Sequence, residues 1–594
     1  MTASASLDRR SFMLRCSALG IGGTLLPGVL WSQVVQGTPI TRESIAVAEQ
    51  IAGVSFTDEQ RDMMVRNLTN QRAASEALHK IPLDNAVAPA IVFDPVPPGV
   101  TLPPKTAQKP VRDRVPVMAR PGSLEDLAFL PVTQLSELVR TRKVKSAELT
   151  DMYLSRLKRY DPLLKCVITL TEERARAQAK AADEDIARGK YRGPLHGIPW
   201  GAKDLLAVKG YLTTWGAGPY KNQTIDTDAE VVRRLDNAGA VLVAKLTLGE
   251  LAQGDVWFDG TTRNPWWPEQ GSSGSSAGPA SATAAGLVGF SIGTETQGSI
   301  SSPSTRCGAS GLRPTFGRVP RTGAMALSWT MDKLGPICRS AEDCALVLGA
   351  IYGPDGNDLS VRDYPFNWDG TRKASALRVG YLKSAFDAPE HNPDNPRFGH
   401  ATKAQDDAAL EVLRSLGVKL IAKELPDINT QAMSGILTAE AGAAFEELTL
   451  SGRVNEMVQQ NAAAWPNTFR AAQFIPAVDY VNANRVRTLL CQKWHELFND
   501  IDVLVVPTNG SAQLVMTNLS GNPAVIVPHG FAEAAPLQGG FNGQPATPPS
   551  PRPQTPVSIT FLGPLYQEEF PLALAHAFQR VTDFHRKQPP LPAL

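Results

Sequence analysis

Four short runs of apolar residues place the tightest limit on the fold of this chain. They are AVLVAK at 240–245, LRVGYL at 377–382, DVLVVP at 502–507 and PAVIVP at 523–528. Each run is nearly continuous in apolar residues, and segments long enough for helices separate them. A strand buried on both faces of its sheet has this composition. We therefore predict an α/β fold in which helices cover the sheet.

The N-terminus carries a different signal. In SLDRRSFMLRCSALGIGGTLLPGVLW, Arg9 and Arg10 precede Ser11, and a weakly apolar, glycine-rich run follows. The pattern resembles a twin-arginine export signal, which is an address read by a receptor and not an anchor. Glycines and Pro27 interrupt the run, so we expect no transmembrane span. Residues 1–33 are predicted to direct export to the periplasm or medium; an ordinary basic N-terminus is the alternative.

The rest of the chain divides by texture. Residues 34–123 contain a stretch with helical periodicity followed by a proline-rich stretch, and we predict an N-terminal extension of two or three helices with a wrapping arm. Residues 124–594 are predicted to form one catalytic domain. Within it, the proline- and glycine-rich segment 533–556 is expected to be a surface insert.

Charge and composition exclude several classes of protein. The net charge of the 594-residue chain is +1, and no nucleic-acid-binding motif is found, so no nucleic-acid partner is expected. The eight histidines and six cysteines show no metal-ligand spacing, so neither a metal nor a cofactor is predicted. Buried free thiols are expected, although an exported protein could form one disulfide bridge.

Three loops rich in small residues call for a joint explanation. The first, HGIPWGAKDLLAVKG, places Lys203 among apolar neighbours. Desolvation lowers the pKa of a lysine and makes it a usable base. The second, EQGSSGSSAGPASATAAG, runs into an alanine-rich stretch and predicts the start of a helix, where backbone N–H groups are unpaired.

The third loop, FSIGTETQGSISSPSTRCG at 290–308, follows an apparent buried strand. Glycine is required where backbone must approach a reacting group closely. The amides of Thr296, Gln297, Gly298 and Ser299 could form an oxyanion-binding nest, with the Ser299 hydroxyl as nucleophile. A serine needs a base, and no histidine lies in these loops, so Lys203 is the remaining candidate.

One rival explanation concerns GSSAG at 274–278, which formally matches the G-x-S-x-G nucleophile elbow of the α/β-hydrolases. That motif requires a strand directly before it. We expect no strand in NPWWPEQ at 264–270, and we reject the elbow on that ground.

Together these residues resemble the amidase signature family. The lysine segment GIPWGAKD and the loop GTETQGSISSPS fit two of its motifs, and further segments fit in the correct order over about residues 124–590. The resemblance implies a large, mixed, mostly covered, twisted sheet flanked by helices. It also implies a catalytic triad of Lys203, Ser275 and Ser299, with Ser275 held by a cis peptide bond. Ser275 is located only by its family spacing from the nucleophile.

Two departures from the family pattern affect the site. Gln297 occupies a position usually held by a glycine, an aspartate or a small apolar residue, but its backbone N–H is retained. Ser301 stands where many members have arginine, and the sequence does not tell whether Arg306 replaces it.

The resulting hypothesis is an amidase, a hydrolase of linear amide C–N bonds that forms an acyl-enzyme on Ser299. A carbamate or ester hydrolase using the same triad is an alternative, as is an inactive exported binding protein on this scaffold. The expected partner is a small-molecule or peptide amide, with no membrane anchoring after signal removal. Which amide is bound stays open, and so does the oligomeric state, for which a homodimer is one option.

Overall fold

The computed structural model describes residues 39–592 apart from Arg114, Val117, 391–399, Gly510 and 535–550. The predicted export signal at 1–33 lies outside the described residues, as does most of the predicted insert. The chain divides into two compact units. One holds residues up to Asp84 together with Ala471–Tyr480, and the other holds Asn85–Arg470 and the residues from Val481 onward. The predicted domain boundary at residue 124 stays a prediction.

Two helices occupy the described part of the predicted N-terminal extension, α3 (Arg42–Ala52) and α4 (Asp58–Leu78). Each helix is preceded by a threonine N-cap, whose side chain accepts a hydrogen bond from the backbone N–H three residues further on. This capping satisfies an N–H group that would otherwise be unpaired in the first turn. Helix α3 ends at Gly53, whose φ of 66° only glycine adopts without strain.

The second unit is built on one mixed sheet of 11 strands in the order β1-β3-β2-β8-β10-β9-β14-β15-β13-β11-β12. The strands at the two ends of this order include the parallel pairs β2–β3, β2–β8, β11–β13 and β11–β12, whereas the middle of the sheet is antiparallel. Their bounds are β1 Val167–Leu170, β2 Pro199–Lys203, β3 Val241–Leu246, β8 Phe290–Glu295, β9 Ser310–Arg313, β10 Lys333–Cys338, β11 Val379–Leu382, β12 Leu420–Lys423, β13 Val503–Pro507, β14 Ala524–Glu533 and β15 Gln554–Leu562.

The four apolar runs correspond to strands β3, β11, β13 and β14. Every residue of β2, β3, β8, β10 and β13 is buried, so both faces of the sheet are covered in its interior. Two-sided burial removes the polar face that would give an alternating pattern, which is why these strands are continuous apolar runs. The predicted covered α/β sheet is confirmed.

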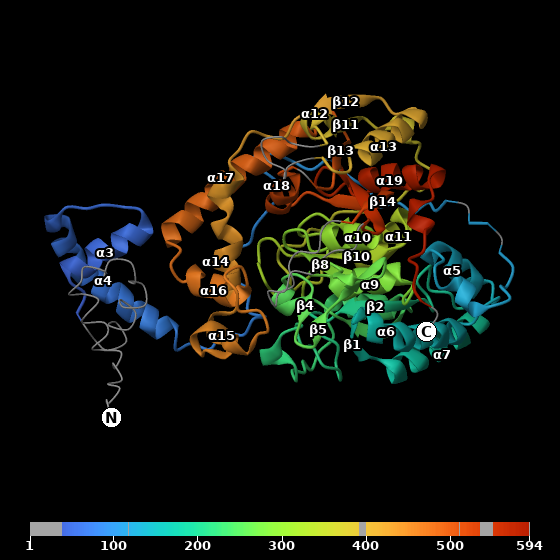
Figure 1. Cartoon of the computed structure of the whole chain (residues 1–594), viewed down its shortest axis with the longest axis horizontal. Helices are drawn as coiled ribbons and strands as arrows, with labels where there is room; N and C mark the ends of the chain where they lie inside the picture. Colours follow the sequence, from blue (N-terminus) through green and yellow to red (C-terminus); the bar gives the residue numbers. More distant parts are fainter. Residues whose placement is uncertain are drawn as a thin grey trace. The chain divides into compact units, whose positions relative to one another are not determined.

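Helices cover this sheet (Figure 1). Helix α9 packs against β8 and β10, α10 against β9, β14 and β15, α11 against β9 and β10, and α19 against β13 to β15. The helices that follow α4 are α5 Val132–Arg140, α6 Ser146–Leu164, α7 Glu172–Ala187, α8 Glu230–Asn237, α9 Ala277–Ala284, α10 Ser301–Cys307, α11 Ala341–Ile351, α12 Lys383–Asp387, α13 Lys403–Ser415, α14 Gly435–Ala444, α15 Glu446–Leu450, α16 Trp465–Ala472, α17 Ala477–Leu497, α18 Gln513–Ser520 and α19 Glu569–Val581.

Two further findings concern sequence expectations. All five cysteines in the described part of the chain are free and buried: Cys166, Cys307, Cys338, Cys344 and Cys491. Among the helices of the described residues, none has the length and apolarity needed to cross a bilayer.

We expect two glycines to respond in opposite ways to alanine substitution. A Cβ at Gly335 in β10 would collide with the carbonyl oxygen of Leu312 in the paired strand, and a backbone atom cannot swing aside. Gly335→Ala should therefore destabilise the fold by about 1–3 kcal/mol. Gly349 lies exposed in α11 with open space around its added Cβ, so Gly349→Ala should stabilise by up to about 1 kcal/mol. Thermal unfolding of both variants checks the sign; a Gly335→Ala protein as stable as the parent would contradict the packing argument.

Candidate active site

Lys203 is the last residue of β2, and its side chain is 0% exposed. Strands β3 and β8 pair with β2 on its two sides, so Lys203 does not lie at an exposed edge of the sheet. Its Nζ lies 2.8 Å from Ser275 Oγ, 2.8 Å from Thr294 Oγ1 and 3.1 Å from Ser276 Oγ. The lysine is thus surrounded by hydroxyl groups.

The protonation state of Lys203 is set mainly by burial. Desolvation lowers its pKa well below the ordinary value of 10.5, while the negative charges of Asp332 and Glu295 act in the opposite direction. Neither carboxylate is within hydrogen-bonding reach of Nζ among its contacts, which are to hydroxyls and one carbonyl. The environment therefore favours a neutral amine.

Ser275 lies in the loop before α9, and the Gly274–Ser275 peptide bond is cis. Asp255, which is not part of this loop, holds it in place: its Oδ2 accepts a hydrogen bond from Ser273 N at 2.8 Å. Gly274 leaves no space for a side chain, because a Cβ there would overlap the carbonyl oxygen of Gly254. The predicted start of a helix after the serine-rich tract is confirmed by α9, which has Ser276 at its N-cap.

The expectation that no strand precedes this loop was wrong. Residues Trp267–Gly271 form β7, which pairs with β6 (Arg263–Asn264) in a separate antiparallel ribbon. Pro265 and Pro268, on either side of the two tryptophans, hid this strand, which pairs at only two registered positions. A nucleophile elbow is still excluded, because β7 is not part of the main sheet and five residues separate it from α9.

Ser299 lies in the loop that joins β8 to α10, and backbone contacts connect it to the Ser275 loop. Its carbonyl oxygen accepts a hydrogen bond from Ser276 N at 3.0 Å, which brings the two predicted catalytic serines onto adjoining segments. Gly298 has a φ of 106°, a conformation that favours glycine. The Gly298 carbonyl accepts from Ser302 N at 2.8 Å, and since the peptide group is planar, the Ser299 N–H points the opposite way.

A buried carboxylate that the sequence analysis left without a role holds this loop. Glu295 Oε2 accepts hydrogen bonds from Ile300 N and Ser301 N, both at 2.8 Å. Its Oε1 accepts from Arg313 Nη1 at 2.8 Å and from Asn518 Nδ2 at 2.9 Å. Burial opposes ionisation, but Arg313 and the amide donors outweigh it and lower the pKa of Glu295 to about 2.

The arginine that pairs with the carboxylate of this loop is not Arg306. The cation paired with Glu295 is Arg313 of β9, and both side chains are 0% exposed. Ser301 contributes its own hydroxyl to Glu295 Oε2 at 2.9 Å. Arg313 lies in the segment GLRPTFGRV, and its role depends on the pairing of β9 beside β10, which has no local sequence signal. The side chain of Gln297, the other departure, is exposed.

Two threonines of β8 and its following loop connect the site to its surroundings. Thr294 bonds to Lys203, and the Oγ1 of Thr296 donates to Asp332 at 2.6 Å. Asp332 also accepts from Leu327 N and Ser328 N at 2.8 and 2.9 Å, so it joins the loop of Ser299 to the segment before β10. Both threonines lie within the stretch singled out from the sequence, but nothing there indicated their partners.

The aromatic residues near the sequence motifs divide between two roles. Trp215 and Trp257 are buried, and Trp215 packs in the core against Phe445. Trp329, in contrast, lines a cavity next to Thr294 and Thr296. Across the described residues, no cluster of three or more histidine, cysteine, aspartate or glutamate side chains is arranged to hold a metal ion.

Comparison with known proteins places the chain among enzymes that act on amide C–N bonds. A family profile described as Amidase matches residues 148–572. The A subunit of the glutamyl-tRNA(Gln) amidotransferase from Roseiflexus castenholzii is 32% identical over 506 residues, covering 77% of this chain and 97% of that protein. The corresponding protein from Dehalococcoides mccartyi is 30% identical and covers 79% of this chain and 100% of its own length.

Solved structures agree with the sequence matches. The native peptide amidase from Stenotrophomonas maltophilia superposes with a TM-score of 0.66 at 27% identity, over 79% of this chain and 100% of that chain. A protein from a vestigial complex, described as revealing the origins of an s-triazine catabolic enzyme, superposes with a TM-score of 0.64 at 27% identity. That match covers 76% of this chain and 98% of the other.

The Glu295–Arg313 pair generates a prediction about acid stability. The folded-state pKa of about 2 lies below the ordinary 4.5, so the pair stabilises the fold above pH 4.5 and its contribution is lost as the pH falls from 4.5 through 2. Glu295→Gln leaves Arg313 buried without its counter-charge and should cost about 3–5 kcal/mol near neutral pH. It should also flatten the pH dependence of the unfolding midpoint in that window.

Thermal unfolding between pH 2 and 7 measures both effects. Glu76→Gln, at an exposed glutamate of α4, is the control and should match the parent throughout. A Glu295→Gln protein with the parent's midpoint at neutral pH would show that the pair does not stabilise the fold.

Proposed function

This chain belongs to the amidase family, and on that premise we propose that it hydrolyses a carboxamide C–N bond through an acyl-enzyme on Ser299. One observation carries the proposal. The desolvated Nζ of Lys203 lies 2.8 Å from Ser275 Oγ, on a segment hydrogen-bonded to the backbone of Ser299. The proposal assigns Lys203 as the base, Ser275 as the relay hydroxyl and Ser299 as the nucleophile.

Hydrogen-bond accounting supports Lys203 as the base. A neutral amine has two N–H groups and one lone pair. Ser276 Oγ donates its hydrogen to the Thr294 carbonyl at 3.0 Å, so it must accept from Lys203. Thr294 Oγ1 can accept the second N–H. The lone pair of Nζ is then left for the hydroxyl of Ser275, as a proton relay requires.

In the proposed first step, Lys203 takes the proton of Ser275 while Ser275 takes the proton of Ser299. The Ser299 oxygen attacks the amide carbonyl carbon, and the developing oxyanion is held by the backbone N–H groups of residues 296–299. The outward direction of the Ser299 N–H is consistent with this role. Each oxyanion donor in such sites contributes about 3 kcal/mol of transition-state stabilisation.

In the second step, Ser275 passes a proton to the leaving nitrogen and takes one back from Lys203, the C–N bond breaks, and the acyl group stays on Ser299. Water then attacks the ester, losing its proton to the same relay, and releases the carboxylic acid. Protonation of the leaving group matters more for amides than for esters, because an amide ion is a far poorer leaving group than an alkoxide. The buried relay supplies that proton.

Two alternative activities use the same residues. Carbamates and esters present a carbonyl to the same nucleophile, and a panel of p-nitroanilides, peptide amides and carbamates separates them by relative kcat/KM. An inactive binding protein on this scaffold would bind such compounds without turning them over. Stoichiometric labelling of Ser299 by a fluorophosphonate favours an enzyme over this last alternative.

The cellular setting forms part of the proposal. Residues 1–33 are proposed to direct export by the twin-arginine route, with function in the periplasm or medium. The relatives from Roseiflexus castenholzii and Dehalococcoides mccartyi are named for a reaction on glutamyl-tRNA(Gln). Because tRNA is charged and used in the cytoplasm, an exported enzyme would not meet it. A small-molecule or peptide amide is therefore the proposed substrate.

We expect Ser299→Ala to lower amide turnover by at least a thousandfold, because no other group replaces the nucleophile. Ser275→Ala and Lys203→Met should have effects of similar size, since the three residues act as one unit. Initial rates of ammonia or amine release measure the loss, and circular dichroism confirms folding. Ser415→Ala, at an exposed serine ending α13, should keep full activity. A folded Ser299→Ala enzyme retaining most of its turnover would refute the mechanism.

The pH profile tests the neutral lysine. Activity requires unprotonated Lys203, so kcat/KM should rise with pH through the pKa of that amine and level off well below pH 10.5, because burial lowers this pKa. A profile still rising at pH 10 would mean that the lysine titrates like an exposed one. Lys203→Arg, which keeps the charge at every accessible pH, should be inactive throughout.

A further inference from the structure

A segment outside the matched family region lies against the catalytic unit beside the site. Residues 85–93, called the strap below, precede the match by more than 50 residues. The amide of Asn85 holds the start of the strap: its Oδ1 accepts from Ala326 N at 2.8 Å, and its Nδ2 donates to Ala326 O at 2.9 Å. Both polar groups of one backbone residue are thus matched by one side chain, as in a pair of strands.

The far end of the strap is held by Phe93. Its ring centroid lies 3.5 Å from the guanidinium carbon of Arg487 and 5.2 Å from the ring of Phe316. Arg487 is 1% exposed and donates to the carbonyls of Leu519 and Thr330 at 2.6 and 2.8 Å. A desolvated cation–π contact of this kind contributes about 2 kcal/mol. The strap therefore has a specific anchor at each end.

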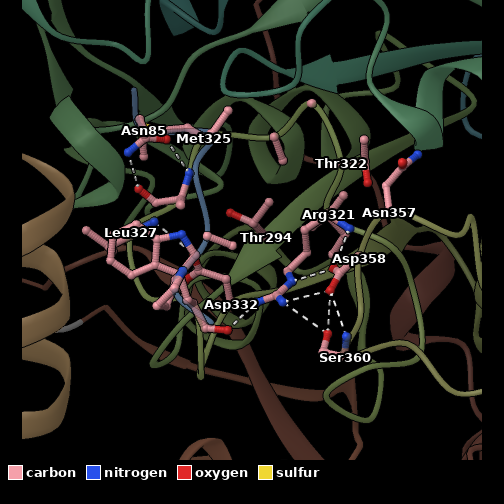
Figure 2. Close-up of a pocket in the computed structure, with 18 of the residues that line it drawn as sticks. Asn85, Thr294, Arg321, Thr322, Met325, Leu327, Asp332, Asn357, Asp358 and Ser360 are labelled. Atoms are coloured by element: carbon pink, nitrogen blue, oxygen red, sulfur yellow. Dashed lines mark hydrogen bonds and ion pairs between the residues drawn. The ribbon is translucent and has the colours of Figure 1, made fainter. Parts of the chain in front are cut away.

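Between its anchors the strap borders a cavity of about 380 Å³ (Figure 2). The cavity is also bordered by Leu205, by residues 324–327 and by Trp329. Thr294 and Thr296 also line the cavity. Thr294 bonds directly to Lys203, so one lining residue of the cavity is in direct contact with the proposed base. Its volume lies within the range of pockets that hold small organic ligands.

The charged groups around the cavity have hydrogen-bond or ion-pair partners within the protein. The charged side chains among its described lining residues are Arg321, Asp332 and Asp358. Arg321 forms a two-point ion pair with Asp358 at 2.8 and 3.0 Å, and Figure 2 shows this pair on one side of the cavity. Asp332 accepts the three hydrogen bonds described above. A substrate carboxylate would find no uncommitted cation among these residues, and a free ammonium group would find no uncommitted carboxylate.

Apolar surface, in contrast, is available on the strap. Ile91 and Val92 are 76% and 45% exposed, although both border the cavity. Met325 and Leu327 contribute further apolar side chains to the lining. An apolar ligand would cover this surface and gain about 0.8 kcal/mol for each buried methylene.

We propose that the strap is a wall of the substrate pocket and that the pocket takes the uncharged, apolar acyl group of an amide. We assign the cavity to the acyl part of the substrate and not to the amine. The leaving amine must reach Ser275 to be protonated, whereas the cavity adjoins Thr294 and Thr296. The inference rests on the proposed function and names its substrate class. Amides of aliphatic acids are preferred over glutamine, whose α-carboxylate and ammonium groups have no partner in this pocket.

Calorimetric titration of the full-length Ser299→Ala protein tests the wall without needing turnover. Hexanamide should bind at least tenfold more tightly than propanamide, and more tightly than glutamine, because three further methylenes contact the pocket. Adding Asn85→Ala or Phe93→Ala should weaken hexanamide binding about tenfold and leave propanamide binding within twofold. A strap with only a structural role would change both ligands equally.

The chain offers a matched control in Asn367, whose side-chain amide holds the same N-terminal arm farther along. Its Oδ1 accepts from Gln108 N at 3.0 Å, and its Nδ2 donates to Thr106 O at 2.9 Å. Asn367→Ala should leave the ratio of hexanamide to propanamide affinity unchanged. Equal binding of the two amides before any strap change, or an equal effect of Asn367→Ala and Asn85→Ala, would overturn the proposal.

Failure of the proposed function is distinguishable from failure of the strap proposal. Hydrolysis of both amides by the wild-type protein is measured separately as ammonia release. Chain-length-dependent binding without hydrolysis contradicts the catalytic mechanism alone. Hydrolysis without chain-length dependence contradicts the strap proposal alone.

Discussion

The desolvation of one amine is the constraint on which the rest of the site depends. Lys203 ends a fully buried strand, and its Nζ meets only hydroxyl groups and a carbonyl. Burying an ammonium ion without a hydrogen-bonded counter-charge costs several kcal/mol, so burial favours the neutral amine. The covered sheet therefore does more than stabilise the fold: by excluding water, it determines the protonation state of the proposed base.

A second buried group solves the opposite problem. Glu295, at the end of the neighbouring strand β8, keeps its charge because Arg313, Asn518 and two backbone amides satisfy its oxygens. The same sheet thus disfavours the charge on Lys203 and favours the charge on Glu295. The difference follows from partners and not from depth, since both side chains are fully buried. Glu295 in turn fixes the backbone on which Ser299 lies.

Asp332 and the strap connect the buried surroundings of Lys203 and Glu295 to the pocket. Asp332 ties Thr296 to the backbone of residues 327 and 328, so the loop of Ser299 and one wall of the cavity are held by a single carboxylate. The strap forms another wall from residues that precede the matched family region.

The sequence by itself determined the covered α/β sheet and placed Lys203, Ser275 and Ser299 within three segments rich in small residues. Continuous apolar strands and glycine-rich turns are local patterns, and their physical causes are local. Strands β2, β9 and β10 were not predicted, because their sequences PWGAK, SGLR and KLGPIC contain glycine or proline. These segments adopt the extended conformation only through pairing with neighbouring strands. The tertiary structure alone decided that Arg313 neutralises Glu295, that Asp332 receives Thr296, and that Asn85 meets Ala326 across 241 residues. Such contacts join residues distant in sequence, and no local pattern encodes which partner a buried charge or amide will meet.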